Sequence, residues 1–152
     1  DCRVDGNMVE INAHYSFGCA SAGTMPEVCK LRTTVTFTQA TQGFGLMLRV
    51  ASDLESAYYI RLEPQSDRMV FDSWPRKGDV PFMVELERPL QLRPGRAVEL
   101  EVLVDGTVCE VYAAGQQALS TRLYNLGAGT WGVFVQEGSA CFQDVSLRVP
   151  GQ

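Results

Sequence analysis

Hydrophobic and polar residues alternate along most of this chain, and no other feature of the sequence restricts the fold as strongly. In the segment 31–38, LRTTVTFT, leucine, valine and phenylalanine fall on one face, and arginine and most of the threonines fall on the other. The segments 57–63, AYYIRLE, and 98–104, VELEVLV, repeat the pattern. A period of two predicts half-buried antiparallel strands, because successive side chains of a strand point to opposite faces. No segment of helical length shows a helical period.

Tight turns separate the strands. Asp105-Gly106 is a strong hairpin signal, since a type I′ turn needs positive φ at both central positions, and PQSD at 64–67 is a second reversal. Further strands are predicted at EINAHYSF (10–17), ALSTRLY (118–124), WGVFVQ (131–136) and FQDVSLRV (142–149). This density of short strands predicts an all-β, two-sheet antiparallel β-sandwich of the lectin-like jelly-roll type. We expect one domain over residues 1–152, with a less regular stretch at 1–30 that holds an edge strand and a loop.

Composition limits the function. The chain has 152 residues, 45% of them hydrophobic, which is sufficient for one globular core. A formal charge of −5, without runs of lysine or arginine, argues against nucleic acid as a partner. No apolar run approaches the length of a membrane span, so we expect no membrane partner. Because the chain begins at Asp1 and not at a methionine, we expect a mature product or an excised domain.

The five cysteines show no spacing typical of a metal site. Cys109 and Cys141 lie in strand-like runs, where a free thiol acts as a small hydrophobic residue. Cys19 and Cys29 flank a loop and are a disulfide candidate in an oxidising compartment; the alternative is two free thiols. The compartment stays open, because free buried thiols favour the cell interior, whereas capture of a polymer favours the exterior. The single histidine, His14, is expected on a strand surface and not as a catalytic base.

The outward face of RMVFDSW, at 68–74, is where we expect a functional site. A tight turn at 64–67 places Tyr59 opposite Asp72. The same register pairs Arg61 with Val70 and Glu63 with Arg68. In GLMLRV, at 45–50, strict alternation buries Leu46, Leu48 and Val50 and turns Met47 and Arg49 outward onto the same sheet. The predicted surface cluster therefore contains Tyr59, Arg61, Asp72 and Trp74, with Arg49 on the preceding strand and Arg76 in the adjoining loop.

This set of side chains suits a sugar. An aromatic ring covers the C–H face of a sugar, and a carboxylate with a guanidinium binds vicinal hydroxyls through charge-assisted hydrogen bonds. Strands hold such groups in place before a ligand arrives. The alternative is that Tyr59–Asp72 and Glu63–Arg68 are ordinary cross-strand pairs, worth about 0.2–1 kcal/mol each. Trp74 would then cover a neighbouring loop or the interface to a missing domain.

The second half of the chain resembles the C-terminal β-sandwich of glycoside hydrolase family 32, which includes invertases, levanases and inulinases. The resemblance is carried by VLVDGTVCEVY (102–112), ALSTRLY (118–124) and GVFVQEGSACF (132–142). The middle section at 43–71, GFGLMLRVASDLESAYYIRLEPQSDRMVF, is similar to the levanase-associated carbohydrate-binding modules that hold terminal fructose. Each motif is short, and the resemblance rests on their order and spacing over roughly residues 31–147.

The family implies a two-sheet sandwich attached to a five-bladed catalytic propeller. The signature segments of the propeller, W-N-D-P, R-D-P and E-C, are absent from this sequence. The resemblance therefore implies a non-catalytic domain, excised from or appended to a glycoside hydrolase. Its expected partners are a carbohydrate, with terminal fructosyl units of levan or inulin favoured, and the parent propeller. The alternative is a structural or oligomerisation module with no sugar site of its own.

Two further candidate sites carry carboxylates. By the resemblance, Glu137 in the turn QEG is an acceptor for a sugar hydroxyl, although many turns contain such a residue. Asp53 and Glu55 are a candidate for sugar hydroxyls or calcium, but two carboxylates alone do not supply the roughly six to eight oxygens that calcium prefers. We therefore expect no metal and no cofactor. Glu85 and Glu87 face the same side of a proline-bounded edge segment and are predicted to be solvated and not catalytic.

Overall fold

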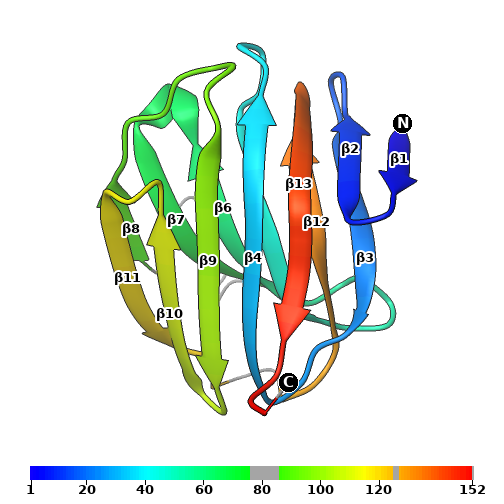
Figure 1. The fold of residues 1–152 in the computed structure, drawn as a ribbon, viewed down its shortest axis with the longest axis vertical. Helices are drawn as coiled ribbons and strands as arrows, with labels where there is room; N and C mark the ends of the chain where they lie inside the picture. The colour runs from blue at the N-terminus through cyan, green and yellow to red at the C-terminus, as the bar shows by residue number, and fades with distance from the viewer. Residues whose placement is uncertain (76–85, 125–126, 152) are drawn as a thin grey trace.

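The computed structural model describes residues 1–75, 86–124 and 127–151, and it places two antiparallel sheets face to face (Figure 1). The seven-stranded sheet has the order β1-β2-β13-β4-β9-β10-β11, and the six-stranded sheet has the order β3-β12-β5-β6-β7-β8. The predicted all-β, two-sheet antiparallel sandwich is confirmed. The strands are β1 (Cys2–Asp5), β2 (Met8–Asn12), β3 (Phe17–Thr24), β4 (Val28–Phe37), β5 (Gly43–Val50), β6 (Ala57–Glu63), β7 (Arg68–Trp74), β8 (Leu86–Pro89), β9 (Val98–Asp105), β10 (Val108–Ala113), β11 (Gln117–Arg122), β12 (Thr130–Gln136) and β13 (Ser139–Arg148), and the short 3-10 helix η1 (Pro64–Ser66) joins β6 to β7.

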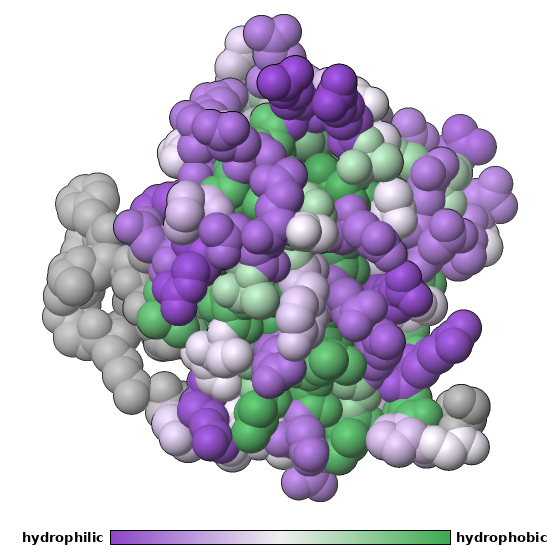
Figure 2. All heavy atoms as spheres, turned by 60° about the vertical axis from the view of Figure 1, so that its left-hand side comes forward, coloured by the Kyte–Doolittle hydropathy of each residue, from purple (hydrophilic) through white to green (hydrophobic). Residues whose placement is uncertain are grey.

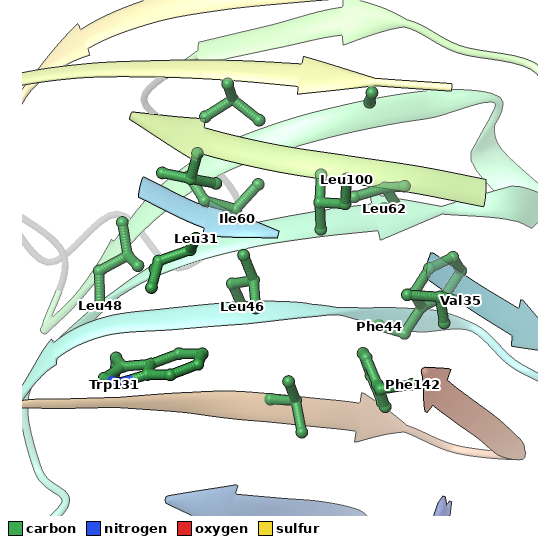
Figure 3. Close-up of a cluster of buried hydrophobic side chains, with 14 of the residues drawn as sticks. Leu31, Val35, Phe44, Leu46, Leu48, Ile60, Leu62, Leu100, Trp131 and Phe142 are labelled. Atoms are coloured by element: carbon green, nitrogen blue, oxygen red, sulfur yellow. The ribbon is translucent and has the colours of Figure 1, made fainter. Parts of the chain in front are cut away.

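The inner faces of the two sheets form the core (Figure 3). On β4 and β9 every second residue is buried, as the alternation predicts. Full burial of one large aliphatic side chain contributes about 1.5–3 kcal/mol, so this face-to-face contact is the main stabilising term. Both sheets supply fully buried residues, among them Leu31, Val35 and Leu100 on the seven-stranded sheet and Leu46, Leu48, Ile60 and Leu62 on the six-stranded sheet.

The N-terminal segment contains the two sheet edges β1 and β3. The predicted single strand at 10–17 is wrong, because the chain reverses between β2 and β3 and these two strands join different sheets. The Ser16 N–H donates to the Ala13 carbonyl at 3.0 Å, and Tyr15 adopts a φ of 54°. His14, which was expected on a strand, is exposed in this turn with its ring centroid 4.1 Å from that of Tyr15.

All five cysteines are free. The candidate pair does not form, because Cys19 packs on the outer face of the six-stranded sheet, whereas Cys29 lies in the core between the sheets. Burial raises the pKa of the Cys109 thiol to about 12. Cys109 is therefore a protonated, unreactive core residue at neutral pH, as its position in a strand predicts.

The surface is mixed in polarity. Hydrophilic side chains cover most of the face shown in Figure 2, and hydrophobic side chains show in the gaps between them. Within the described part of the chain there is no helix with the length and hydrophobicity that a membrane crossing requires. The edge strand β8 pairs only with β7 in the described residues, and Glu87 on it forms an ion pair with Arg68 at 2.7 Å.

A β-bulge breaks the alternation of β5. Thr130 pairs with Val50 and Gly132 pairs with Met47, so two residues of β5 lie opposite Trp131. Such an extra residue bends the strand and re-aims the side chains beyond it. Val50, predicted to face the core, instead joins Met47 in a buried cluster on the outer face.

Arg49 is turned inward by the same bulge, and the prediction that it faces outward is wrong. Its φ is 50° and its side chain is almost completely buried, with 5% of the residue exposed. The guanidinium donates to the Leu123 carbonyl at 3.2 Å and to the Gly106 carbonyl. Both acceptors belong to the seven-stranded sheet or the segment that follows it, so Arg49 links the two sheets at this end of the sandwich.

Replacement of Arg49 by methionine is expected to lower the free energy of unfolding by about 2–4 kcal/mol, since each buried carbonyl left without its donor costs about 1–3 kcal/mol. Urea denaturation followed by tryptophan fluorescence measures the loss. Arg32→Met is the control, because Arg32 is exposed and its ion pairs with Glu99 and Glu101 are worth at most about 1 kcal/mol. Equal losses in the two variants would contradict the inter-sheet role of Arg49.

Candidate functional site

A pocket of about 280 Å³ opens on the outer face of the six-stranded sheet. The predicted cluster lies in it: Tyr59, Arg61, Asp72 and Trp74 all line this one pocket. Strands β3, β6, β7 and β12 and the loop between β5 and β6 supply the walls. The lining side chains not included in the predicted cluster are Phe17, Leu54, Ser73, Phe134 and Gln136.

The hairpin β6–β7 sets the geometry of the cluster. The observed register pairs Tyr59 with Asp72, Arg61 with Val70 and Glu63 with Arg68, which confirms the predicted pairs. The reversal is made by η1, which begins at a proline and ends at Asp67 in the left-handed conformation with φ 49°. In this register the outward residues of β6 and β7 stand side by side.

The pocket borders an apolar cluster to which its lining residue Phe134 belongs. Met47, Val50, Ala57 and Phe134 form a cluster on the outer face that is separate from the main core, and Tyr59 packs against it. The Tyr59 and Phe134 rings meet edge to face, with centroids 5.3 Å apart and an interplanar angle of 88°. Such contacts hold the Tyr59 ring in one orientation.

The rim of the pocket carries exposed hydrophobic side chains. Trp74 is 54% exposed, and Leu54, at the tip of the β5–β6 loop, is 60% exposed. Phe17, from β3, stacks on Phe134 with ring centroids 5.5 Å apart and also lines the pocket. Two aromatic rings and one leucine thus stand around the opening with faces available to a ligand.

One side of the pocket is charged. The Arg61 guanidinium lies between two carboxylates: its Nη2 is 3.4 Å from Asp72 Oδ2, and its Nε is 3.7 Å from Glu63 Oε1. Asp72 is buried, and its Oδ1 accepts from the Ser73 N–H at 3.0 Å. The guanidinium and the carboxylate are therefore presented to the pocket as a fixed pair of donor and acceptor groups.

Tyr59 supplies a neutral hydroxyl. Burial raises the pKa of Tyr59 above its ordinary value, the neighbouring Cys19 adds to this rise, and the charge of Arg61 opposes it. The phenol therefore stays protonated at neutral pH, where it both donates and accepts hydrogen bonds.

The charged pair continues into a row of alternating charges along β6, β7 and β8. Arg68 binds Glu63 through two hydrogen bonds, Nε to Oε2 at 3.0 Å and Nη2 to Oε1 at 2.9 Å. Its Nη1 donates to Glu87 at 2.7 Å. These hydrogen bonds, first to Glu63 and then to Glu87, raise the pKa of Arg68. We call Asp72, Arg61, Glu63, Arg68 and Glu87 the charge ladder.

Two glycines on β5 allow close approach of their neighbours on β6. Gly43 and Gly45 occupy outward positions on β5, between β6 and β12. A Cβ at Gly43 would lie 3.1 Å from Cδ of Arg61 and 3.3 Å from its Cγ. A Cβ at Gly45 would overlap the carbonyl oxygen of Ile60. The Arg61 stem thus lies in space that the missing side chain at Gly43 leaves open.

The remaining predicted residues lie elsewhere. Arg49 is buried between the sheets, for the reason given above. Arg76 lies outside the described residues. Glu137 is half-buried in the turn after β12, where its N–H donates to the Ser16 carbonyl at 2.9 Å. Its neighbour Gln136 lines the pocket, and Glu137 is not one of the lining residues among those described.

The loop carboxylates do not form a cluster. Asp53 Oδ1 accepts from the Glu55 N–H at 2.9 Å, which is a local turn contact. In the ranges 1–75, 86–124 and 127–151, no group of three or more histidine, cysteine, aspartate or glutamate side chains could hold a metal ion.

Sequence reasoning missed half of the pocket for two different reasons. Phe134 and Gln136 alternate with the core residues Val133 and Val135, so the period-two pattern could have placed them outward. The outward glycines of β5 were a further signal, since glycine within a strand often marks a close approach. Phe17 and Leu54 had no such signal, because their positions depend on how β3 and the β5–β6 loop lie against the sheet.

The protein family model described as "Glycosyl hydrolases family 32 C terminal" matches residues 16–149. No curated protein sequence matches this chain. The matched residues contain β3 to β13, and β1 and β2 precede them. This match shows that the chain belongs to the family.

Solved structures share the sandwich at low sequence identity. The carbohydrate-binding module CBM66 from Bacillus subtilis has a TM-score of 0.76 and 15% identity, and the alignment covers 97% of this chain and 91% of that one. Galectin LEC-6 from Caenorhabditis elegans has a TM-score of 0.62 and 14% identity, covering 90% and 95%. The β-fructofuranosidase from Aspergillus kawachii has a TM-score of 0.69 and 16% identity, covering 93% of this chain but 26% of that one. This chain thus spans about a quarter of the length of the fructofuranosidase.

The two glycines should respond differently to alanine. Gly45→Ala is expected to cost about 3 kcal/mol or more, because the new Cβ meets backbone that cannot move aside. Gly43→Ala is expected to cost about 1 kcal/mol and to displace Arg61, because the new Cβ meets only a flexible side chain. Urea denaturation measures both, and a crystal structure of Gly43→Ala shows the Arg61 position. If Arg61 keeps its position in Gly43→Ala, the space at Gly43 is not what places the Arg61 stem.

Proposed function

Because this chain belongs to the family of C-terminal domains of family 32 glycosyl hydrolases, we propose that it is a non-catalytic carbohydrate-binding module that recognises terminal fructosyl units of fructans such as levan and inulin. The observation that carries this proposal is the exposed Trp74 ring beside the Arg61–Asp72 pair in one pocket on rigid strands. The fold alone does not decide between functions, since sandwiches host many of them, so the pocket is the main support.

The chemistry of the pocket fits a neutral sugar. Trp74 and Phe17 offer ring faces to the C–H groups of a sugar, and the pair Arg61–Asp72 offers donors and an acceptor to adjacent hydroxyls. Tyr59 and Gln136 add groups that both donate and accept. In this proposal the sugar ring lies across the Trp74 face with its hydroxyls toward Arg61.

The size of the pocket supports recognition of one terminal unit. Its volume of about 280 Å³ is at the low end for small-molecule sites, which typically hold roughly 300–1,000 Å³. The aromatic rim and Leu54 bound it on the surface of the sheet. A shallow pocket makes few fully desolvated contacts, so we expect weak binding per site.

The proposed role follows from the longer chains in which such domains occur. In the Aspergillus kawachii β-fructofuranosidase the matching region is about a quarter of a longer chain. We propose that this domain likewise accompanies a catalytic propeller and brings it to its polymer. The signature segments of a propeller active site are absent from this sequence, which supports a non-catalytic role.

A structural or oligomerisation module is the second candidate, and one observation favours it. A pocket of about 480 Å³ lies at one end of the seven-stranded sheet and contains several aliphatic side chains, Val28, Leu103, Val108, Val149 and Pro150. Val28 and Val108 are each more than a third exposed. This surface would suit contact with another domain, and it carries no aromatic ring to stack on a sugar.

Isothermal titration calorimetry with levan, inulin and fructose tests the proposal. Trp74→Ala is expected to weaken fructan binding about ten- to thirtyfold, the cost of truncating an aromatic anchor. Asp72→Asn is expected to weaken it comparably, because Arg61 and the ligand both lose a charged acceptor. The control is Tyr112→Ala, which removes an exposed aromatic ring from β10 on the other sheet.

The outcomes separate the candidates. Losses in Trp74→Ala and Asp72→Asn with unchanged binding in Tyr112→Ala would support the pocket. Binding that survives the first two changes would move the site, with the Glu137 turn as the next position to vary. An absence of binding to any fructan or to a wider set of glycans would favour the structural module.

A further inference from the structure

Glu63 lies next to the pocket without lining it. It is an outward residue at the end of β6, two positions from Arg61, and its side chain is 13% exposed. It touches Arg61 and Arg68. Any effect of Glu63 on a bound sugar must therefore pass through Arg61.

Arg61 is held from both sides. Asp72 approaches Nη2 at 3.4 Å, and Glu63 approaches Nε at 3.7 Å, at opposite ends of the guanidinium. The side chains of Arg61 and Asp72 are 15% and 5% exposed, so water and salt screen these attractions less than they screen a surface pair. The stem lies over Gly43, which limits its movement toward the sheet. These contacts together leave the guanidinium one orientation.

Glu63 is itself fixed by its neighbours. Arg68 binds both of its oxygens, at 2.9 and 3.0 Å, and a bidentate contact of this kind defines direction as well as distance. Arg68 is anchored in turn by Glu87 at 2.7 Å. The position of Glu63 is therefore set before any ligand binds.

The ladder also sets the charge that a ligand meets. Three carboxylates and two guanidiniums alternate along it, so each guanidinium lies between two carboxylates. Arg61 shares its positive charge with two carboxylates, so it can donate hydrogen bonds to hydroxyls but offers little net attraction to an anion. An acidic sugar would in addition lie beside the Asp72 carboxylate, which lines the same pocket, and like charges repel.

From this geometry we infer that Glu63 is a positioning residue that makes the pocket selective for neutral sugars over anionic ones. It does so by orienting the Arg61 guanidinium and offsetting its charge. The inference rests on the proposed function, because it assumes that the pocket binds a sugar. It identifies the ligand class as neutral and polyhydroxylated.

Two matched variants test the inference. Glu63→Gln and Glu87→Gln each remove one negative charge from the ladder, but only Glu63 touches Arg61. By calorimetry, Glu63→Gln is expected to weaken inulin binding about tenfold, the size of one charge-assisted contact, and Glu87→Gln to change it by less than about twofold. Carboxymethyl inulin should bind the unmodified domain more weakly than inulin does. Glu63→Gln should narrow or reverse that preference, and equal effects of the two variants on both ligands would overturn the inference.

A measurement without ligand separates this inference from the proposed function. In the NMR spectrum the Arg61 Nε–H signal should be dispersed and slow to exchange with water, and Glu63→Gln should collapse it, whereas Glu87→Gln should not. A signal unaffected by Glu63→Gln would refute the positioning role even if inulin binds. If the unmodified domain binds no sugar, the proposed function and the selectivity fail, while the NMR signal still decides whether Glu63 positions Arg61. Thermal unfolding confirms that each variant is folded.

Discussion

The packing of one sheet face against the other is the constraint on which the rest of this structure depends. Burial of every second residue on the inner strands supplies most of the stabilising free energy, and it determines at the same time which residues point outward. Tyr59 and Arg61 stand on the outer face because their neighbours on β6 are buried. The pocket therefore takes its geometry from the core beneath it, and its side chains are held in place by the strands.

Strand β5 departs locally from the alternation of buried and outward residues, and this departure has two consequences. Its bulge turns Arg49 inward, where it links the sheets, and turns Val50 outward, where it joins the apolar cluster that contains Phe134. Its outward Gly43 leaves space that the Arg61 stem fills. Bulges and glycines within strands commonly mark such places, because they change the direction of side chains or allow close approach.

The charges of the outer face work in pairs and not as single groups. Arg61 meets the pocket with its positive charge largely offset by Asp72 and Glu63, so its value to a ligand lies in the direction of its N–H groups. The solved structures that share this sandwich differ from it at most positions. Function in such a fold depends on the residues of the site and not on the sandwich itself.

By itself the sequence determined the all-β class, the face of most strands and the β6–β7 register, because each of these depends on residues close together in the chain. The Tyr59–Asp72 pair follows from one short turn and the period of two. Tertiary structure decided the rest. Arg49 reverses its face only because β12 pairs with β5 through a bulge, and Phe17 reaches the pocket only because β3 pairs with β12. Such placements depend on contacts between distant segments, which no local pattern records.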